Sequence, residues 1–199
     1  MIAGIILAAG RSSRMGRAKA LLRSPGGLTF VHRLARAMCD GGLADTIVVG
    51  RPEDAGLRQE VAAIGTPVRF IENPGADAGQ LSSVLAGLDA AQNDHLQAVV
   101  LAPVDAPLIR PETFAAVAAV FASSGAPIVR AVHGGRHGHP VLFSHAIFEA
   151  LRRADPAIGA RSLVRGQAHL VVNVEVDDPG VLTDVDTPED YARLIGPVA

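Results

Sequence analysis

The sequence has little of what holds small secreted proteins together or anchors a chain in a membrane. It has one cysteine, Cys39, no tryptophan and 4% aromatic residues. A single cysteine excludes a disulfide within the chain and is typical of a reducing compartment. The apolar run at residues 2–9 follows no basic segment and is too short for a signal peptide or a membrane span. We therefore expect a cytoplasmic protein that does not associate with membranes.

A strong overall charge is also lacking. The 199 residues carry a formal net charge of −2. No overall field therefore attracts nucleic acid, and any positive charge that matters must be local. Hydrophobic residues make up 49% of the chain, which is enough for a packed core. No repeat or linker divides the sequence, and its length suits one domain over residues 1–199.

Short apolar runs alternate with segments of helical periodicity. We expect strands at residues 2–9, 45–50, 67–73, 96–103, 126–132 and 169–176, and helices at residues 28–42, 52–65, 80–92, 111–125 and 188–196. This alternation predicts an α/β protein with a three-layer, Rossmann-like fold, in which helices cover both faces of a mostly parallel central sheet. Residues 139–144 are a candidate antiparallel strand. We expect residues 133–168 to form a lobe over one edge of the sheet.

A glycine-rich, basic stretch, LAAGRSSRMGRAK at residues 7–19, follows the first expected strand. In an open α/β sheet, ligands bind beyond the carboxyl ends of the strands. Small residues let a ligand approach the backbone, and N–H groups together with cations such as Arg14 and Lys19 make an anion site. The spacing matches neither a Walker A loop nor a dinucleotide-binding turn. The alternative is an ordinary solvated loop that is basic.

Two acidic segments are candidates for metal ligation. Asp105 follows the strand at residues 96–103, where a carboxylate can hold Mg²⁺ against a phosphate. Its alternative is a turn-forming aspartate bonded to its own backbone. In DVDTPEDY, residues 184–191, one acid or Thr187 can cap the helix that follows. A spare carboxylate there, such as Asp186, can join Asp105 in a metal site.

Two more polar segments lie near expected strand ends. Ser82 and Ser83 lie near the start of an expected helix, where hydroxyl and N–H groups either hold polar ligand edges or cap the helix. The stretch HGGRHGHPVLF, residues 133–143, contains three histidines. With one cysteine in the chain and no carboxylate evident nearby to orient these histidines, zinc is not favoured. A loop over a ligand, with Arg136 and His139 as polar contacts, is the favoured interpretation.

Together these segments resemble the MobA-like nucleotidyltransferase family from residue 2 to the region of residue 195. The opening stretch fits the family turn L-A-[AG]-G-x(3)-R-M-G-x(2)-K. PVDAP resembles the family's metal-binding segment, and DVDTPEDY resembles its C-terminal acidic segment. Three details are similar to the molybdenum cofactor cytidylyltransferase branch: Ala9 in place of glycine, the short spacing from Gly16 to Lys19, and GRHGHPVLF.

The resemblance implies an Mg²⁺-dependent transfer of CMP from CTP to a phosphorylated acceptor, molybdenum-bound molybdopterin, with release of pyrophosphate. A molybdoenzyme or its maturation chaperone is an implied partner. The residues that it implies are Arg14, Lys19 and Asp105 for catalysis; Asp105 and Asp186 for the metal; Arg136 and His139 for the acceptor; and Leu7, Ala8, Ala9, Gly10, Lys19, Gly79, Ser82 and Ser83 for the nucleotide.

Three other functions stay open at this point. A nucleotidyltransferase for a sugar or alditol phosphate uses the same loop, so only residues 133–168 distinguish it. A catalytically silent, nucleotide-binding partner of a molybdoenzyme maturation factor has no need of Lys19, Asp105 and Asp186. A redox enzyme is disfavoured, because the sequence has neither a dinucleotide fingerprint nor a redox cysteine pair.

Overall fold

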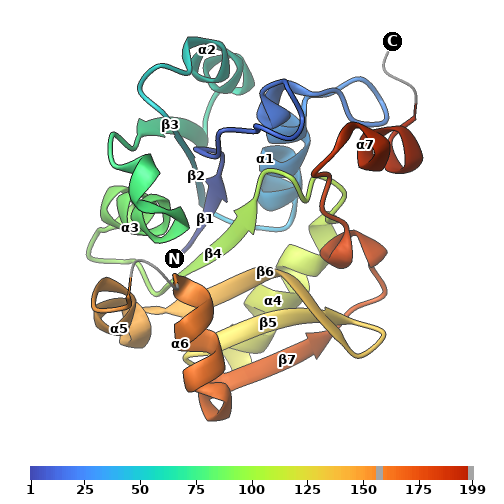
Figure 1. Ribbon diagram of the computed structural model, residues 1–199. Helices are drawn as coiled ribbons and strands as arrows, with labels where there is room; N and C mark the ends of the chain where they lie inside the picture. Colours follow the sequence, from blue (N-terminus) through green and yellow to red (C-terminus); the bar gives the residue numbers. More distant parts are fainter. Residues whose placement is uncertain (156–158, 197–199) are drawn as a thin grey trace.

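The computed structural model describes residues 1–155 and 159–196 and contains a seven-stranded sheet (Figure 1). Residues 156–158, inside the expected lobe, and 197–199, inside the expected domain, lie outside the described residues. The strand order is β3-β2-β1-β4-β6-β5-β7. The strands are β1 (Ile2–Leu7), β2 (Asp45–Gly50), β3 (Val68–Glu72), β4 (Ala98–Pro103), β5 (Ile128–His133), β6 (Arg136–Ser144) and β7 (Val171–Glu175).

Only β6 runs against its neighbours within the described sheet. It pairs antiparallel with β4 and β5, whereas all the other pairings are parallel. The expected antiparallel strand is therefore confirmed, but it begins at Arg136 and lies inside the sheet. It is joined to β5 by Gly134 and Gly135, whose φ angles are 56° and 73°. Two positive φ angles in a two-residue connection are typical of the tight turns that join antiparallel strands.

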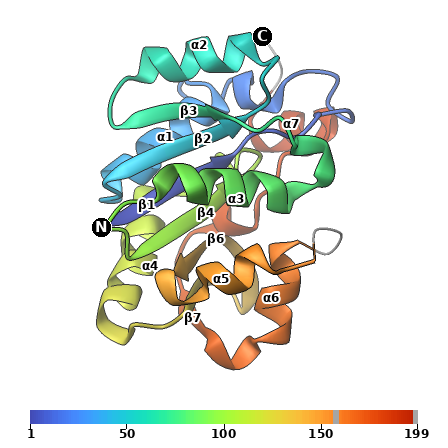
Figure 2. The ribbon, with the colours of Figure 1, turned by 90° about the vertical axis from the view of Figure 1, so that its left-hand side faces the viewer.

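Helices cover both faces of the sheet, which confirms the three-layer prediction (Figure 2). Helices α1, α2 and α4 pack on one face, and α3, α5 and α6 pack on the other. The helices are α1 (Phe30–Asp40), α2 (Ala55–Ile64), α3 (Gln80–Ala91), α4 (Pro111–Ser124), α5 (Phe148–Arg152), α6 (Ala160–Gly166) and α7 (Pro188–Leu194). Within the described ranges, no helix combines the length and apolar character needed to cross a membrane.

Successive residues of the central strands contribute to opposite layers of the core. Ile6 of β1 packs with Val48 in the layer under α1 and α4, whereas Ile5 packs with Ile47 in the layer under α3. All four side chains are fully buried. Because both faces of these strands are covered, each strand appears in the sequence as a continuous apolar run.

One helix starts later than its local signal predicts, and another starts at a clear capping motif. We expected the second helix to open at Pro52, but that boundary is wrong. The chain first makes a turn, in which the Asp54 N–H donates to the Arg51 carbonyl at 3.1 Å, and α2 begins after Asp54. At α7, the Thr187 hydroxyl accepts a hydrogen bond from the Asp190 N–H at 3.1 Å, and the Asp190 carboxylate accepts one from the Thr187 N–H. Thr187 is therefore the cap of α7.

The parallel strands β1 to β4 end at one edge of the sheet, where the loops that follow them meet (Figure 1). Such an edge is where open α/β sheets bind ligands. Segment 133–168 contributes β6 to the sheet and, in its described part, α5 and α6 to one face.

Candidate functional site

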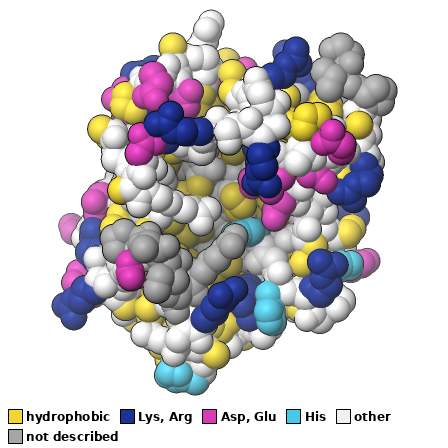
Figure 3. Space-filling view, in the orientation of Figure 1, with side chains coloured by type: hydrophobic (Ala, Val, Ile, Leu, Met, Phe, Trp, Pro, Cys, Tyr) yellow, Lys and Arg dark blue, Asp and Glu magenta, His cyan; other side chains and the backbone are white. Residues whose placement is uncertain are grey.

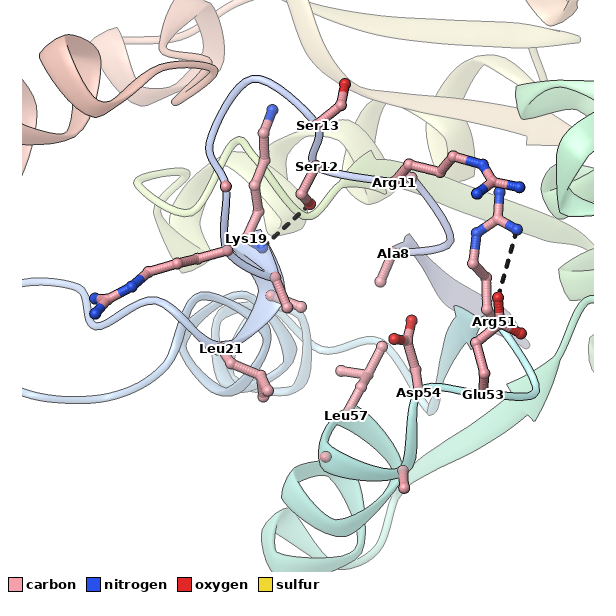
Figure 4. Close-up of a pocket in the computed structure, with 17 residues that line it drawn as sticks. Ala8, Arg11, Ser12, Ser13, Lys19, Leu21, Arg51, Glu53, Asp54 and Leu57 are labelled. Carbon is pink, nitrogen blue, oxygen red and sulfur yellow. Dashed lines mark hydrogen bonds and ion pairs between the residues drawn. The ribbon is translucent and has the colours of Figure 1, made fainter.

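The loop after β1 is folded around Ser12. Ser12 has a φ of 50°, and its carbonyl accepts hydrogen bonds from the N–H groups of Met15 and Gly16 at 3.0 and 3.2 Å. Its hydroxyl accepts a hydrogen bond from the Lys19 N–H at 3.2 Å (Figure 4). These contacts bend the loop back on itself and fix the backbone at the start of the short helix η1 (Lys19–Leu21).

Lys19 joins two carboxylates that are far apart in the sequence. Its Nζ donates to Asp105 Oδ2 at 3.1 Å and to Asp186 Oδ1, and the Lys19 side chain is only 10% exposed. Arg14 Nη2 lies 3.1 Å from Asp186 Oδ2. The hydrogen bond from Lys19, with the charges of Lys19 and Arg14, holds the pKa of Asp186 below its usual value. The structure therefore brings Arg14, Lys19, Asp105 and Asp186 together.

The Asp105 carboxylate is not used to form its own turn. A backbone hydrogen bond from the Ala106 N–H to the Pro103 carbonyl, 3.1 Å long, closes that turn. The Asp105 carbonyl accepts a hydrogen bond from the Val185 N–H at 2.8 Å, which ties the two acidic segments together. The carboxylate itself points at Lys19. The interpretation of Asp105 as a turn-forming aspartate is therefore not supported.

Asp105 and Asp186 have the donor chemistry of a magnesium site. Both contact the same ammonium group, so they lie within reach of one cation, and carboxylate oxygens are ligands that Mg²⁺ prefers. Across the described residues, no group of three or more His, Cys, Asp or Glu side chains is placed to hold a metal ion. A cation held by these two acids would take its other ligands from water and substrate phosphates, which is usual for Mg²⁺.

A pocket of about 470 Å³ opens beside these carboxylates, and we call it the nucleotide pocket after the predicted nucleotide-binding residues that line it. Its walls are the ends of β1 and β4, the loop after β1 and the start of α3. Ser82 is not among the lining residues, whereas Gln80 and Asp77, which we did not predict, are. The predicted nucleotide-binding residues that line it are Leu7, Ala8, Ala9, Gly10, Lys19, Gly79 and Ser83.

Asn73, which the sequence analysis missed, orients the two serines at this pocket. Its Nδ2 donates to Ser82 Oγ and to Ser83 Oγ at 2.9 Å each, and its Oδ1 accepts from the Gly75 N–H at 2.9 Å. Helix α3 has no side-chain cap, so the serines do not cap it. The sequence does contain one sign of this role, because Asn73 stands at the carboxyl end of the strand expected at residues 67–73.

Two arginines tie the loop after β1 to the loop after β3. Arg11 and Arg51 pair with the carboxylate of Asp77 at 2.7 and 2.6 Å, and Arg51 Nε donates to the Ala9 carbonyl at 2.9 Å. The hydrogen bond from Arg11, and then that from Arg51, lower the pKa of Asp77 to about 2. The carboxylate is therefore ionised throughout the neutral range, and the tie links two walls of the nucleotide pocket.

A second pocket of about 670 Å³ adjoins the nucleotide pocket, and we call it the acceptor pocket after the predicted acceptor residues that line it. The two share the lining residues Leu7, Gln80 and Pro103. Arg136 and His139, which we predicted to contact an acceptor, both line this second pocket from β6. Figure 3 shows a hollow in this face of the molecule with an apolar interior and charged side chains around it. The predicted nucleotide and acceptor residues thus lie on the two sides of the ends of β1 and β4.

A third cavity of about 560 Å³ lies between the loop after β1 and the start of α2 (Figure 4). Asp54 and Leu57 form part of its wall, and the Lys19 side chain extends away from both. Neither Asp105 nor Asp186 lines this cavity. It nevertheless adjoins the pocket beside the carboxylates, because Ala8, Gly10, Arg11, Ser12, Lys19 and Arg51 line both.

Gly138, in the G-H-P stretch beside the acceptor pocket, has no room for a side chain. A Cβ at this position would lie 2.0 Å from the Val181 carbonyl oxygen, in the short helix η5 (Pro179–Leu182). The helix η5 can therefore approach β6 this closely only because residue 138 is glycine. This approach fixes the position of η5, from which the chain continues to Asp186.

Replacing Gly138 with alanine should lower the free energy of unfolding by about 1–3 kcal/mol, the usual cost of overpacking. Urea unfolding measures this change. Gly166→Ala is the matched control, because a Cβ there meets nothing within 4 Å. Equal stability of the two variants would contradict the close approach of η5.

Comparison with known proteins assigns the family. The family model of the MobA-like NTP transferase domain matches residues 4–172. The molybdenum cofactor cytidylyltransferase of Escherichia coli (strain K12) is 28% identical over 94% of this chain and 92% of its own length. The molybdenum cofactor guanylyltransferase of Rhodobacter capsulatus is 31% identical, over 96% of this chain and 94% of its own. The structure of Rv0371c from Mycobacterium tuberculosis H37Rv in complex with manganese is similar, with a TM-score of 0.77, 28% identity and 98% of each chain covered. The chain therefore belongs to the MobA-like NTP transferase family.

Proposed function

We propose that the protein transfers CMP from CTP to the phosphate of molybdenum-bound molybdopterin, with Mg²⁺ as cofactor, and releases pyrophosphate. The observation that carries the proposal is the contact of Lys19 with both Asp105 and Asp186 at the end of a glycine-rich turn, beside the nucleotide pocket. Family membership supports nucleotidyl transfer, and similarity to molybdenum cofactor cytidylyl- and guanylyltransferases supports this acceptor. The choice of CTP rests on Ala9, the short spacing from Gly16 to Lys19 and the G-H-P stretch. A cytoplasmic location and a molybdoenzyme or its chaperone as partner belong to the same proposal.

The chain's own residues act by position and charge. Arg14 and Lys19 neutralise the triphosphate, and their effect grows as negative charge builds up on the departing pyrophosphate. Asp105 and Asp186 hold Mg²⁺, which when bound supplies further neutralisation of phosphate charge. The adjoining pockets bring the two substrates together, so that much of the entropy cost of their encounter is met on binding.

The chemistry exchanges one phosphorus–oxygen bond for another. An oxygen of the acceptor phosphate bonds to the α-phosphorus of CTP, and the bond from that phosphorus to the oxygen bridging it to the β-phosphorus breaks in line. Pyrophosphate leaves with the electron pair of the broken bond, and CMP stays joined to the acceptor through a new P–O–P linkage. The acceptor phosphate is already an anion at neutral pH, so the reaction needs neither a protein nucleophile nor a strong general base.

Pyrophosphate release with a panel of substrates tests the proposal. CTP, GTP, ATP and UTP are each paired with molybdenum-bound molybdopterin and with sugar and alditol phosphates. We expect the fastest release with CTP and the pterin phosphate. Faster release with an alditol phosphate would identify the other nucleotidyltransferase function, and no release with any pair would indicate a silent binding partner.

The base preference is expected to depend in part on Ala9. Its side chain is 6% exposed and lines the nucleotide pocket, where a methyl group should crowd a purine more than a pyrimidine. One such steric difference is worth about 1–3 kcal/mol, or roughly tenfold to two-hundredfold in kcat/KM. Ala9→Gly should therefore narrow the preference for CTP over GTP without reversing it. Measuring kcat/KM for both nucleotides with one acceptor decides this, and equal wild-type values would contradict it.

A further inference from the structure

Arg130 lies beside apolar side chains on the sheet at the floor of the acceptor pocket. The strand register aligns Leu101 of β4 with Val141 of β6, Val141 with Arg130 of β5, and Arg130 with Asn173 of β7. Residues aligned in this way point to the same face of a sheet. Leu101, Val141 and Arg130 all line the acceptor pocket. On the sheet face that α6 covers, these aligned side chains are therefore aliphatic on β4 and β6 and charged on β5.

Hydrogen bonds orient Arg130, and none of them, among the described residues, is accepted by an acid. Its Nε and Nη2 donate to Asn173 Oδ1 at 3.2 and 3.0 Å. No carboxylate in residues 1–155 or 159–196 forms an ion pair with it. The Arg130 side chain is partly buried, and this burial lowers the pKa of its guanidinium. A half-buried cation held by one neutral amide keeps further N–H donors for an anion in the pocket.

The rim of the acceptor pocket adds positive charge. Arg136 of β6 and Arg165 of α6 line it, and neither pairs with an acid in the part of the chain that the structure describes. Among the described lining residues, Asp184 is the only carboxylate, against three arginines. The pocket as a whole therefore favours an anionic ligand.

Arg130 lies away from the place where the two pockets meet. The pockets share Leu7 and Pro103, the last residues of β1 and β4. Arg130 is two strands beyond β4 and is aligned, through Val141, with a residue two positions before Pro103. With strands about 4.8 Å apart and a rise of about 3.3 Å per residue, its backbone is on the order of 10 Å from Pro103. Its guanidinium is held by Asn173 of β7, on the side of β5 away from β4, so a group that it binds is not the phosphate that reacts beside Asp105.

We propose that Arg130, oriented by Asn173, binds a second anionic group of the acceptor, remote from the phosphate that reacts. This inference rests on the proposed function, because it takes this pocket as the acceptor site. The acceptor then carries charge at both ends, and its middle lies against Leu101 and Val141. Arg130 is a specificity-determining residue, because it disfavours phosphates whose far end is neutral, such as simple alditol phosphates.

Two small probes test this assignment without nucleotide: straight-chain hexanediol bisphosphate, and the same diol with one phosphate. Calorimetric titration of the wild-type protein should show tighter binding of the bisphosphate by about tenfold to a hundredfold, as expected for one charge-assisted contact. Arg130→Gln should remove most of that preference and leave the affinity for the monophosphate unchanged. Arg130→Lys keeps the charge and should therefore keep part of the preference for the bisphosphate. Asn173→Ala should weaken this preference without abolishing it.

Arg153→Gln is the matched control. The Arg153 side chain is 81% exposed, pairs with Glu149 and does not line the acceptor pocket, so the preference should stay at the wild-type value. Thermal unfolding of each variant checks that it is folded. A purely structural role for Arg130 predicts lower thermal stability with an unchanged preference, and that result would overturn the assignment. Equal binding of the two probes by the wild-type protein would overturn it as well.

The probes also separate this inference from the proposed function. A protein that prefers the bisphosphate through Arg130 but releases no pyrophosphate with any substrate pair contradicts the proposed function and supports the anion site. A protein that transfers CMP normally, with the same probe preference in the wild type and in Arg130→Gln, contradicts the role of Arg130 alone.

Discussion

Replacing Lys19 with alanine should lower kcat by about a hundredfold, the usual cost of losing one preorganised charge at the reacting centre. Lys19 is buried, ends the glycine-rich turn and contacts both acids of the site. In the proposed reaction, its ammonium would stabilise the charge that develops on pyrophosphate. Steady-state kinetics with saturating CTP and acceptor measure the effect.

A matched control for this substitution lies in the same loop. Arg17→Ala removes the same charge, but Arg17 forms no ion pair with a carboxylate in the described residues. Its kcat should stay within about twofold of the wild-type value, because exposed charges contribute little. Near-normal turnover of Lys19→Ala, or an equal loss in both variants, would show that the contact with Asp105 and Asp186 does not matter for catalysis.

The same substitution should strengthen metal binding to the free protein. The Lys19 ammonium neutralises the two carboxylates that we propose as metal ligands, so ammonium and cation compete for them. Titration with Mn²⁺ without nucleotide, followed by electron paramagnetic resonance, measures the affinity independently of turnover. Weaker Mn²⁺ binding by Lys19→Ala would place the metal elsewhere.

Replacing Asp105 with asparagine should lower Mg²⁺-dependent kcat by at least about a hundredfold and leave the fold intact. The change removes the charge that holds the metal and keeps the shape of the side chain. The Asp105 side chain is 26% exposed, and the hydrogen bond from the Val185 N–H to its carbonyl does not depend on the carboxylate. Kinetics over a range of Mg²⁺ concentrations and urea unfolding measure the two expectations separately.

Asp178, unlike Asp105, is expected to matter for stability and not for catalysis. Its carboxylate is 3% exposed and accepts hydrogen bonds from the Arg110 N–H, the Thr113 hydroxyl and the Gly180 N–H at 2.8, 2.7 and 2.9 Å. Asp178→Asn should lower the free energy of unfolding by about 1–3 kcal/mol, because it disturbs a satisfied buried acceptor. The kcat of its folded fraction should be unchanged. If Asp105→Asn behaved in this way, Asp105 would be a structural residue.

The sequence predicted those features that depend on local pattern. Continuous apolar runs marked the parallel strands, because both faces of those strands are buried. The helix expected at residues 111–125 is α4, which ends at Ser124 and is capped by Gly125 with a φ of 62°. Asp105 and the loop after β1 were predicted because strand ends are where such sheets bind ligands. Whether the predicted residues bind nucleotide, metal and acceptor stays a prediction.

Features that depend on tertiary contacts were not predicted. The position of β6 between β4 and β5 follows from strand order, which no local pattern encodes. Asn73 and Asp77 matter because of hydrogen bonds to side chains on other segments. Pro52 is a common first residue of a helix, but here a turn precedes the helix, so a correct local signal placed the start of α2 too early.

The fate of labelled CTP tests the central claim most directly. The protein is incubated with Mg²⁺, molybdenum-bound molybdopterin and CTP labelled at either the α- or the γ-phosphorus. We expect the α-label to enter the acceptor product and the γ-label to appear in pyrophosphate, in equal amounts. Release of the γ-label as inorganic phosphate, or no transfer of the α-label to the acceptor, would contradict it.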